Sequence, residues 1–388
     1  GSLVYQCGVE ALAAPDFVVG PDAPKAKRNL PGVIQIVGEK TGARVMQLLQ
    51  DNHKIAAIIA GRYIHSAGCI IGGMSKPITE QERKQIQELA ERSVETALFS
   101  LQLFNDVVLK DQTYADMILS DAYSHETYYM GLVDHNNQVN FYDGKVRVVD
   151  PAGKELLQFN PDEYQHVVAE HIEPWTYLKF PYLKSVGWKG FVDGPDSGIY
   201  RATPLSRLNA ADGMATPKAQ SEYERFYKTL GGKPVHATLA THWARLIELL
   251  YAAERSLELV QDPEITSEEI RTIPTETPGE GVGIVEAPRG TLIHHYKSDE
   301  KGLIRRANLI VGTTNNHAAI SMSIKKAAQN FVLAGQEISD GILNKIEMAF
   351  RAYDPCLGCA THALPGKTPM ILRVYDHHQE LIQETHRE

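Results

Sequence analysis

The 388-residue sequence predicts a mostly α-helical protein with small β pieces, an α+β fold. Apolar residues recur at helical spacing in several segments that are long enough to be helices. The strand signals, in contrast, are short and few. The composition, 43% hydrophobic and 22% charged, is that of an ordinary globular protein, and no internal repeat is evident. We therefore expect a single domain over residues 1–388, or two tightly fused lobes.

The clearest helix signal begins at a capping box. Thr79 and Glu82 have the T-x-x-E spacing in which each side chain bonds to the backbone N–H of the other residue. Apolar residues between Ile86 and Leu101 then follow at helical spacing, which we interpret as core packing. Periodicity predicts further helices over 32–60, 218–230, 237–262, 316–335 and 339–351.

Three segments stand apart from the helices. Residues 139–149 are typical of a β-hairpin, because two apolar runs flank a tight Asp143-Gly144 turn. Residues 370–375 form a second candidate strand near the end of the chain. Residues 186–217 are rich in Gly, Pro, Asp and Ser and show little periodicity. Such a long irregular stretch is usually functional or an interface.

Bulk properties exclude several classes of protein. The net charge of -9 provides no basic surface for general nucleic-acid binding. No run of about 18 apolar residues predicts a transmembrane span, and from the opening residues we do not expect a signal peptide. Four cysteines do not form a disulfide framework. Isolated thiols and one CxxC pair suit a reducing cytoplasm, which is the location we expect.

The segment Asp354–His362 (D-P-C-L-G-C-A-T-H) is the most informative motif. Cys356 and Cys359 are spaced so that both sulfurs can turn onto one metal, and His362 adds a nitrogen close by. A CxxC pair alone has three interpretations: half of a zinc site, a thioredoxin-like redox pair, or half of a soft-metal site completed elsewhere. No second CxxC or HxxxH supports zinc, and the motif does not begin a βαβ unit.

Together with other segments, this motif resembles the carboxy-terminal metal motif of nickel–iron hydrogenase large subunits. The resemblance covers nearly the whole chain. The residues of Glu173–Tyr182 and Leu205–Asn209 are most similar to the cytoplasmic, bidirectional branch of that family. The further matching segments, in chain order, are Gly61–His65, Gly72–Met74, Glu173–Tyr182, Leu205–Asn209, Glu286–Gly290, Asn308–Val311 and Thr313–Asn316.

The resemblance implies a hydrogenase-type fold and a nickel ion held by four cysteine thiolates. Two of these thiolates bridge to an iron that carries cyanide and carbon monoxide. Cys356 would be a terminal nickel ligand, and Cys359 would bridge the two metals. His362 matches the last histidine of the family, which supports a magnesium ion near the end of the chain.

The same resemblance assigns roles to residues around the metals. Arg289 would place a guanidinium over the open metal position and assist heterolytic splitting of dihydrogen. Asp16 and Asp354 resemble the carboxylates that hold such an arginine. Pro288 would form a wall of the pocket. Thr313 or Thr314 would donate a hydrogen bond to an iron-bound cyanide.

Without the family match, these residues have simpler interpretations. Arg289 could be a surface cation after a proline turn, and Asp16 could cap a helix or a turn. Thr313 and Thr314 belong to a cluster that could be only a turn or an N-cap. Cys7 and Cys69 are most simply small buried apolar residues.

The sequence departs from the family pattern at both ends. The family has a second CxxC near its amino terminus, with a proton-relaying glutamate before it, and this sequence has neither. Residues 363–388 follow His362, whereas family members are typically cut after that histidine once nickel is in place. The chain is then either an uncleaved precursor or a family member that escapes processing, and we expect the extension to be an uncleaved maturation peptide.

The resemblance predicts the catalytic subunit of a hydrogenase that reversibly splits dihydrogen into protons and electrons. Its expected partners are an iron–sulfur small subunit, further subunits linked to NAD, deazaflavin or heterodisulfide, and a maturation chaperone and endopeptidase. The partner should hide a large apolar surface. The alternatives are an inactive apo precursor that maturation factors recognise, and a structural relative from a quinone-reducing complex.

Overall fold

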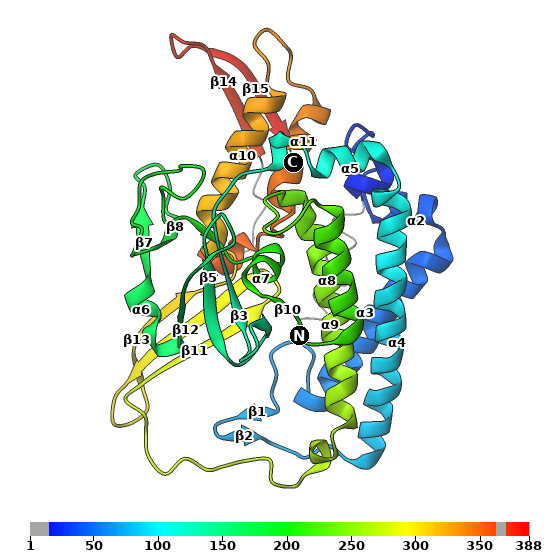
Figure 1. The fold of residues 1–388 in the computed structure, drawn as a ribbon, viewed down its shortest axis with the longest axis vertical. Coiled ribbons are helices and arrows are strands. Elements are labelled where there is room, and N and C mark those ends of the chain that lie inside the picture. Colours follow the sequence, from blue (N-terminus) through cyan, green and yellow to red (C-terminus); the bar gives the residue numbers. More distant parts are fainter. Residues whose placement is uncertain (1–14, 362–369, 388) are drawn as a thin grey trace.

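The computed structural model describes residues 15–361 and 370–387. Long helices lie along one side of the molecule, and most of the β structure lies on the other (Figure 1). Helix α4 packs against both α3 and α9, and α8 packs against α9. The predicted mostly helical α+β class is confirmed. The principal helices are α2 (Leu30–Val37), α3 (Glu39–Ala60), α4 (Glu80–Phe104), α8 (Pro217–Thr229), α9 (Thr241–Gln261), α10 (His317–Phe331) and α11 (Asp340–Arg351).

The capping box is confirmed at the start of α4. The backbone N–H of Glu82 donates to Thr79 Oγ1 at 3.2 Å, and the N–H of Thr79 donates to Glu82 Oε2 at 2.9 Å. The apolar stripe from Ile86 to Leu101 contributes to the buried core, as its periodicity predicted. The sequence therefore predicted both the first residue of this helix and its buried face.

The prediction of one helix over 32–60 is wrong in one respect. The structure has two helices there, and Gly38 separates α2 from α3. Gly38 has φ +89 and ψ 149, a conformation that cannot continue a helix and that favours glycine. Its N–H donates to Ile34 O at 2.9 Å and closes the last turn of α2.

The predicted hairpin over 139–149 is also wrong in its pairing. Strands β4 (Gln138–Val139) and β5 (Lys145–Val149) both exist, but each pairs with β3 (Tyr128–Val133) rather than with the other. All six residues of β3 are buried, so this apolar strand takes the central position between them. The full sheet has the order β10-β4-β3-β5-β6, and β9 also pairs with β3. Its remaining strands are β6 (Glu155–Phe159), β9 (Tyr200–Arg201) and β10 (Gly213–Met214).

The irregular segment 186–217 contains a buried helix that the sequence did not predict. Helix α7 (Pro204–Ala210) is only seven residues long, too short to show periodicity, and all of its residues are buried. Thr203 caps it, because its Oγ1 accepts the N–H of Ser206 at 3.2 Å. The helix packs against β3 and α9, so it joins the sheet to the helical layer.

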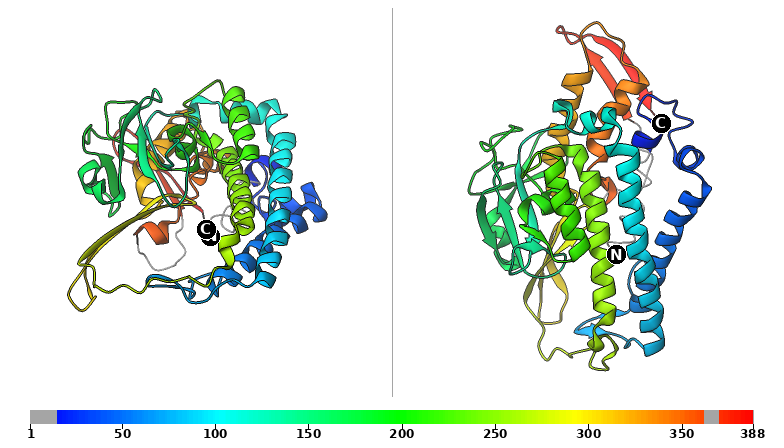
Figure 2. Two further views of the ribbon diagram at one scale, coloured as in Figure 1. Left: turned by 60° about the horizontal axis from the view of Figure 1, so that its bottom comes forward. Right: turned by 45° about the vertical axis from the view of Figure 1, so that its right-hand side comes forward.

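A three-stranded antiparallel sheet, β11-β12-β13, extends away from the helices (Figure 2). Its apolar residues share a core with β3 and β5. The strand predicted at 370–375 is confirmed as β14 (Met370–Tyr375) and pairs with β15 (Leu381–Arg387). None of the helices in the described ranges is long and apolar enough to cross a membrane. The other strands and short helices are β1 (Cys69–Ile70), β2 (Gly73–Met74), α5 (Gln112–Ile118), α6 (Tyr164–Val167), β7 (Val168–Ile172), β8 (Lys179–Leu183), β11 (Glu280–Ala287), β12 (Gly290–Ser298), β13 (Ile304–Ile310) and α12 (Leu357–Thr361).

Candidate metal centre

A tight turn presents Arg289 at one end of the three-stranded sheet. Strands β11 and β12 remain paired up to Ala287 and Gly290, so Pro288 and Arg289 alone form the turn. Gly290 has φ +149, and a Cβ there would lie 2.5 Å from the carbonyl oxygen of Ala202. Only glycine fits, and the close approach anchors the turn against the protein body. Pro288 is half-buried beside Arg289.

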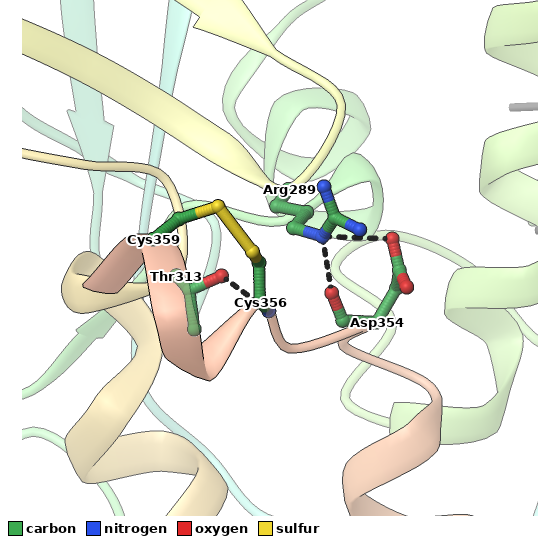
Figure 3. Close-up of a disulfide and its surroundings, with 5 residues drawn as sticks. All are labelled: Arg289, Thr313, Asp354, Cys356 and Cys359. Atoms are coloured by element: carbon green, nitrogen blue, oxygen red, sulfur yellow. Dashed lines mark hydrogen bonds and ion pairs between the residues drawn. A yellow bond between two sulfur atoms is a disulfide. The ribbon is translucent and has the colours of Figure 1, made fainter. Parts of the chain in front are cut away.

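Arg289 pairs with Asp354, which follows helix α11. Its Nε donates to the backbone oxygen of Asp354 at 2.6 Å and lies 3.0 Å from the Oδ2 of the same residue (Figure 3). Asp354 has φ +52, a conformation that few non-glycine residues adopt. Burial raises the pKa of Asp354 and lowers the pKa of Arg289, although each partner's charge opposes the shift of the other. The predicted pairing of these two residues is therefore present.

Cys356 and Cys359 lie next to this pair, with their sulfur atoms bonded to each other (Figure 3). Their Cα atoms are 5.3 Å apart, and Cys359 belongs to the short helix α12. The hydroxyl of Thr313 accepts the backbone N–H of Cys356 at 3.1 Å. Thr313 thus lies beside the cysteine pair, and Thr314 is buried in the following turn. A hydrogen bond from either threonine to a cyanide stays a prediction.

Asp16 contacts the site through α11. Its Oδ1 accepts from Arg351 Nη1 at 2.8 Å, and Arg351 lies three residues before Asp354. The carboxylate is 1% exposed, and burial raises its pKa against the opposing charges of Arg351 and Arg28. Asp16 therefore holds the end of the helix that leads into Asp354. Its predicted role of holding Arg289 directly stays a prediction.

Two sulfur atoms are half of the donor set that the resemblance implies. Within residues 15–361 and 370–387, no group of three or more His, Cys, Asp and Glu side chains could hold a metal ion. Cys69 is exposed on the short strand β1, so the expectation that it is a buried apolar residue is wrong, and Cys7 and His362 lie outside the described residues. With the bond between their sulfur atoms reduced, the thiolates of Cys356 and Cys359 would be soft donors on one short segment, beside a guanidinium, and would fit one side of a nickel centre. The described residues do not supply the other side.

A chain of buried charges behind the site was missed from the sequence. Arg207 on α7 donates to both carboxylate oxygens of Glu248 on α9, at 2.6 and 2.7 Å. Its Nη1 also donates to Glu286 Oε2 at 2.8 Å and to the Ala287 carbonyl oxygen at 2.9 Å. Because Ala287 directly precedes the Pro288-Arg289 turn, this chain fixes the turn to the helical layer. Such bidentate pairs are geometrically specific as well as strong.

Arg245 lies three residues before Glu248 on the same helix and is 2% exposed. Its Nη2 donates to the Ala352 carbonyl oxygen at 3.1 Å, while Nε and Nη1 have no hydrogen-bond partner in the described part of the chain. Burial lowers the pKa of Arg245 to about 10. The sequence signal was two charged residues, Arg245 and Glu248, inside the otherwise apolar run from Trp243 to Ala253.

The chain is similar to known proteins over most of its length. A model of the family described as nickel-dependent hydrogenase matches residues 42–362. An iron-sulfur subunit of the F420-non-reducing hydrogenase from Archaeoglobus profundus is 49% identical over 96% of this chain and 76% of its own length. The beta subunit of the NAD-reducing hydrogenase HoxS from Cupriavidus necator is 36% identical over 97% of this chain and 76% of its own length.

A solved structure agrees with these relatives. The crystal structure of an NAD+-reducing NiFe hydrogenase in the H2-reduced state superimposes with a TM-score of 0.84, at 33% sequence identity. The match covers 93% of this chain and 79% of that chain. The fold and the site thus define a metal-dependent oxidoreductase of the hydrogenase large-subunit class. The chain belongs to the nickel-dependent hydrogenase family, in which it is the large, catalytic component that acts on H2.

Proposed function

We propose that Cys356 and Cys359 hold one side of a nickel–iron centre and that Arg289 is the catalytic arginine beside it. The observation that carries this proposal is the convergence of two distant segments, the Pro288-Arg289 turn and residues 354–359, on one point (Figure 3). Cys356 would be the terminal nickel ligand and Cys359 the bridging ligand to an iron with cyanide and carbon monoxide. When bound, the centre supplies the redox chemistry that separates H2 into protons and electrons.

The residues of the chain position and stabilise charge around that chemistry. Asp354 holds Nε of Arg289, which fixes the plane of the guanidinium. Burial lowers the pKa of Arg289, so its proton is more readily exchanged than that of an exposed arginine. Pro288 restricts the turn, and Thr313 holds the backbone at Cys356. Asp16 supports Asp354 through Arg351.

Substitution of Arg289 tests this proposal. We expect Arg289→Lys to lower kcat for hydrogen oxidation about 100-fold, because lysine cannot keep two bonds to Asp354. Nickel and iron contents should stay at wild-type level. Arg305→Lys is the matched control, since Arg305 lies on β13 of the same sheet and is 68% exposed. Full activity in Arg289→Lys would contradict the role of this residue.

Cysteine substitution tests the ligand assignment separately. We expect Cys359→Ser to lose hydrogen uptake together with nickel, and to lose the infrared bands of cyanide and carbon monoxide, because serine is a hard and poor ligand for these metals. Exposed Cys69 provides the matched Cys69→Ser control. If Cys359→Ser retained both metals and activity, the assignment of Cys359 would be wrong.

We further propose that the partner is an iron–sulfur small subunit, in a cytoplasmic complex with further electron-transfer subunits. Support comes from relatives that are named as single subunits of F420-non-reducing and NAD-reducing hydrogenases. The acceptor could thus be linked to NAD, deazaflavin or heterodisulfide. Large apolar side chains are also exposed along residues 30–71, as expected of a face that a partner covers. These side chains are Leu30, Ile36, Met46, Tyr63, Ile64, Ile70 and Ile71.

The extension after His362 favours a second state of the same protein. We propose that 1–388 is one domain and that 363–388 is a maturation peptide, present before an endopeptidase and a chaperone complete the site. His362, with a magnesium ion, would mark the cleavage point. An inactive apo precursor is thus the second candidate. Mass spectrometry of the chain from the active complex tests this, since a mass that includes Glu388 would show that activity does not require cleavage.

A further inference from the structure

The two residues that precede Asp354, Ala352 and Tyr353, both form hydrogen bonds to other segments of the fold. The Ala352 carbonyl oxygen accepts from Arg245, and the hydroxyl of Tyr353 lies 2.9 Å from Ser323 Oγ and 3.3 Å from His125 Nε2. All of these side chains are buried. The backbone therefore enters the unusual conformation of Asp354, φ +52, from a fixed position.

Arg245 contacts the segment that leads into Asp354 from helix α9. Its Nη2 donates to the Ala352 carbonyl oxygen at 3.1 Å, so a buried cation holds the backbone two residues before Asp354. Arg289, on the turn between β11 and β12, forms the ion pair with the Asp354 carboxylate at 3.0 Å. Asp354 is therefore held at its side chain by Arg289 and at the preceding backbone by Arg245.

The hydrogen bonding of Arg245 argues against a purely structural role. Arg207, on the neighbouring helix α7, satisfies its donors with two carboxylates and a carbonyl oxygen. Arg245 has only the Ala352 bond, and two of its nitrogens are unpaired among the described residues. A buried charge with unpaired donors destabilises a fold, so its location has to be explained by the site that it faces.

We propose that Arg245 is a positioning residue for the hydrogenase reaction, which holds Asp354 so that its carboxylate faces Arg289. The inference rests on the catalytic role proposed for Arg289. In this arrangement α9 fixes both halves of the Arg289–Asp354 pair. Glu248 fixes the turn through Arg207, and Arg245 fixes the segment from Ala352 to Asp354.

Three variants of the complete purified complex test the proposal. Arg245→Met removes the charge and keeps much of the volume, Arg245→Lys restores a cation, and Arg255→Met is the control on the less buried part of the same helix. We expect Arg245→Met to lower kcat roughly tenfold or more, with KM for H2 within about twofold of wild type. Nickel content should be unchanged. Arg245→Lys should recover part of the loss, and Arg255→Met should resemble wild type.

Two further measurements distinguish positioning from general damage. Hydrogen exchange of the peptide over residues 350–356 should increase in Arg245→Met and not in Arg255→Met. Adding Asp354→Asn to Arg245→Met should cost little beyond Asp354→Asn alone, because Arg245 acts through Asp354.

The proposal is overturned if Arg245→Met keeps wild-type kcat, or if its effect multiplies fully with that of Asp354→Asn. It is also overturned if Arg245→Met and Arg245→Lys lose nickel and activity to the same extent, since that result indicates a structural role. Wild-type activity in Arg289→Lys would instead reject the proposed function itself.

Discussion

Helices α3 and α9 are almost equal in length, 22 and 21 residues, but their environments are opposite. Every residue of α9 from Thr241 to Glu254 is buried, including Arg245 and Glu248. Helix α3 buries only Leu48, Asp51, Asn52 and Ile55, and runs along the outside of α4 (Figure 2). Helix length thus says little about the role of a helix in this fold.

Charged side chains have different environments on the two helices. On α3, charged side chains lie mostly at the surface, where water screens them and each contributes little. On α9, Arg245 and Glu248 lie inside the protein: Glu248 pairs with Arg207 on α7, and Arg245 bonds to the Ala352 carbonyl oxygen near the cysteines. The buried helix therefore links the two segments that form the site, and the exposed helix does not.

Removing one carboxylate from each helix should give the largest difference in the free energy of unfolding. Glu248→Gln breaks a pair in which both side chains are at most 1% exposed, and we expect a loss of about 3–5 kcal/mol in the free energy of unfolding. Asp51→Asn is the matched change on α3. Asp51 pairs with Arg92, whose side chain is 49% exposed, so about 1 kcal/mol is expected. Equal losses in urea unfolding would refute the distinction between the helices.

The pH dependence of stability provides the next test of the buried helix. Burial lowers the pKa of His242 on α9 to about 3. The unfolded chain, with an ordinary histidine pKa of about 6.5, then binds a proton that the folded chain excludes. Stability should therefore fall as the pH falls from about 6.5 towards 3, by about 1.4 kcal/mol per pH unit for this one proton.

His242→Gln should remove this single-proton contribution and make the stability profile flatter over the same pH range. Some slope should remain, because burial also lowers the pKa of His236 to about 4. Urea unfolding of the wild type and the variant at several pH values between about 4 and 7 measures the difference. Identical slopes would show that His242 is not excluded from protonation in the folded state.

The sequence predicted what depends on local chemistry. The capping box at Thr79 and the long helices follow from short motifs or from periodicity, and the pair formed by Arg289 and Asp354 follows from the family motifs. Gly38 was visible in the sequence, but a glycine inside a helical pattern is often tolerated, so the break it causes was missed.

What the sequence did not predict depends on contacts between distant segments. Strand β3 separates β4 from β5 because it can bury all of its residues, and no local rule ranks that pairing above the hairpin. Likewise, Arg207 and Glu248 are 41 positions apart and meet only in the folded chain. The same holds for Arg245 and Ala352. Periodicity predicts helix α9, but it does not identify the partners of the buried charges on that helix.

The smallest effect on stability is expected for exposed apolar side chains on α2 and α3. Ile36 on α2 and Met46 on α3 are 60% and 44% exposed, so serine at both positions should change the free energy of unfolding by no more than about 0.5 kcal/mol. The proposed iron–sulfur partner should nevertheless dissociate roughly tenfold more readily, because the apolar area that it covers is smaller. Leu259→Ser, at a 46% exposed position on α9, is the control. Co-purification and gel filtration of the complex measure the outcome. If the double variant retained its partner as the control does, the exposed apolar side chains of residues 30–71 would have no role in assembly, and the contrast between the two helices would concern stability alone.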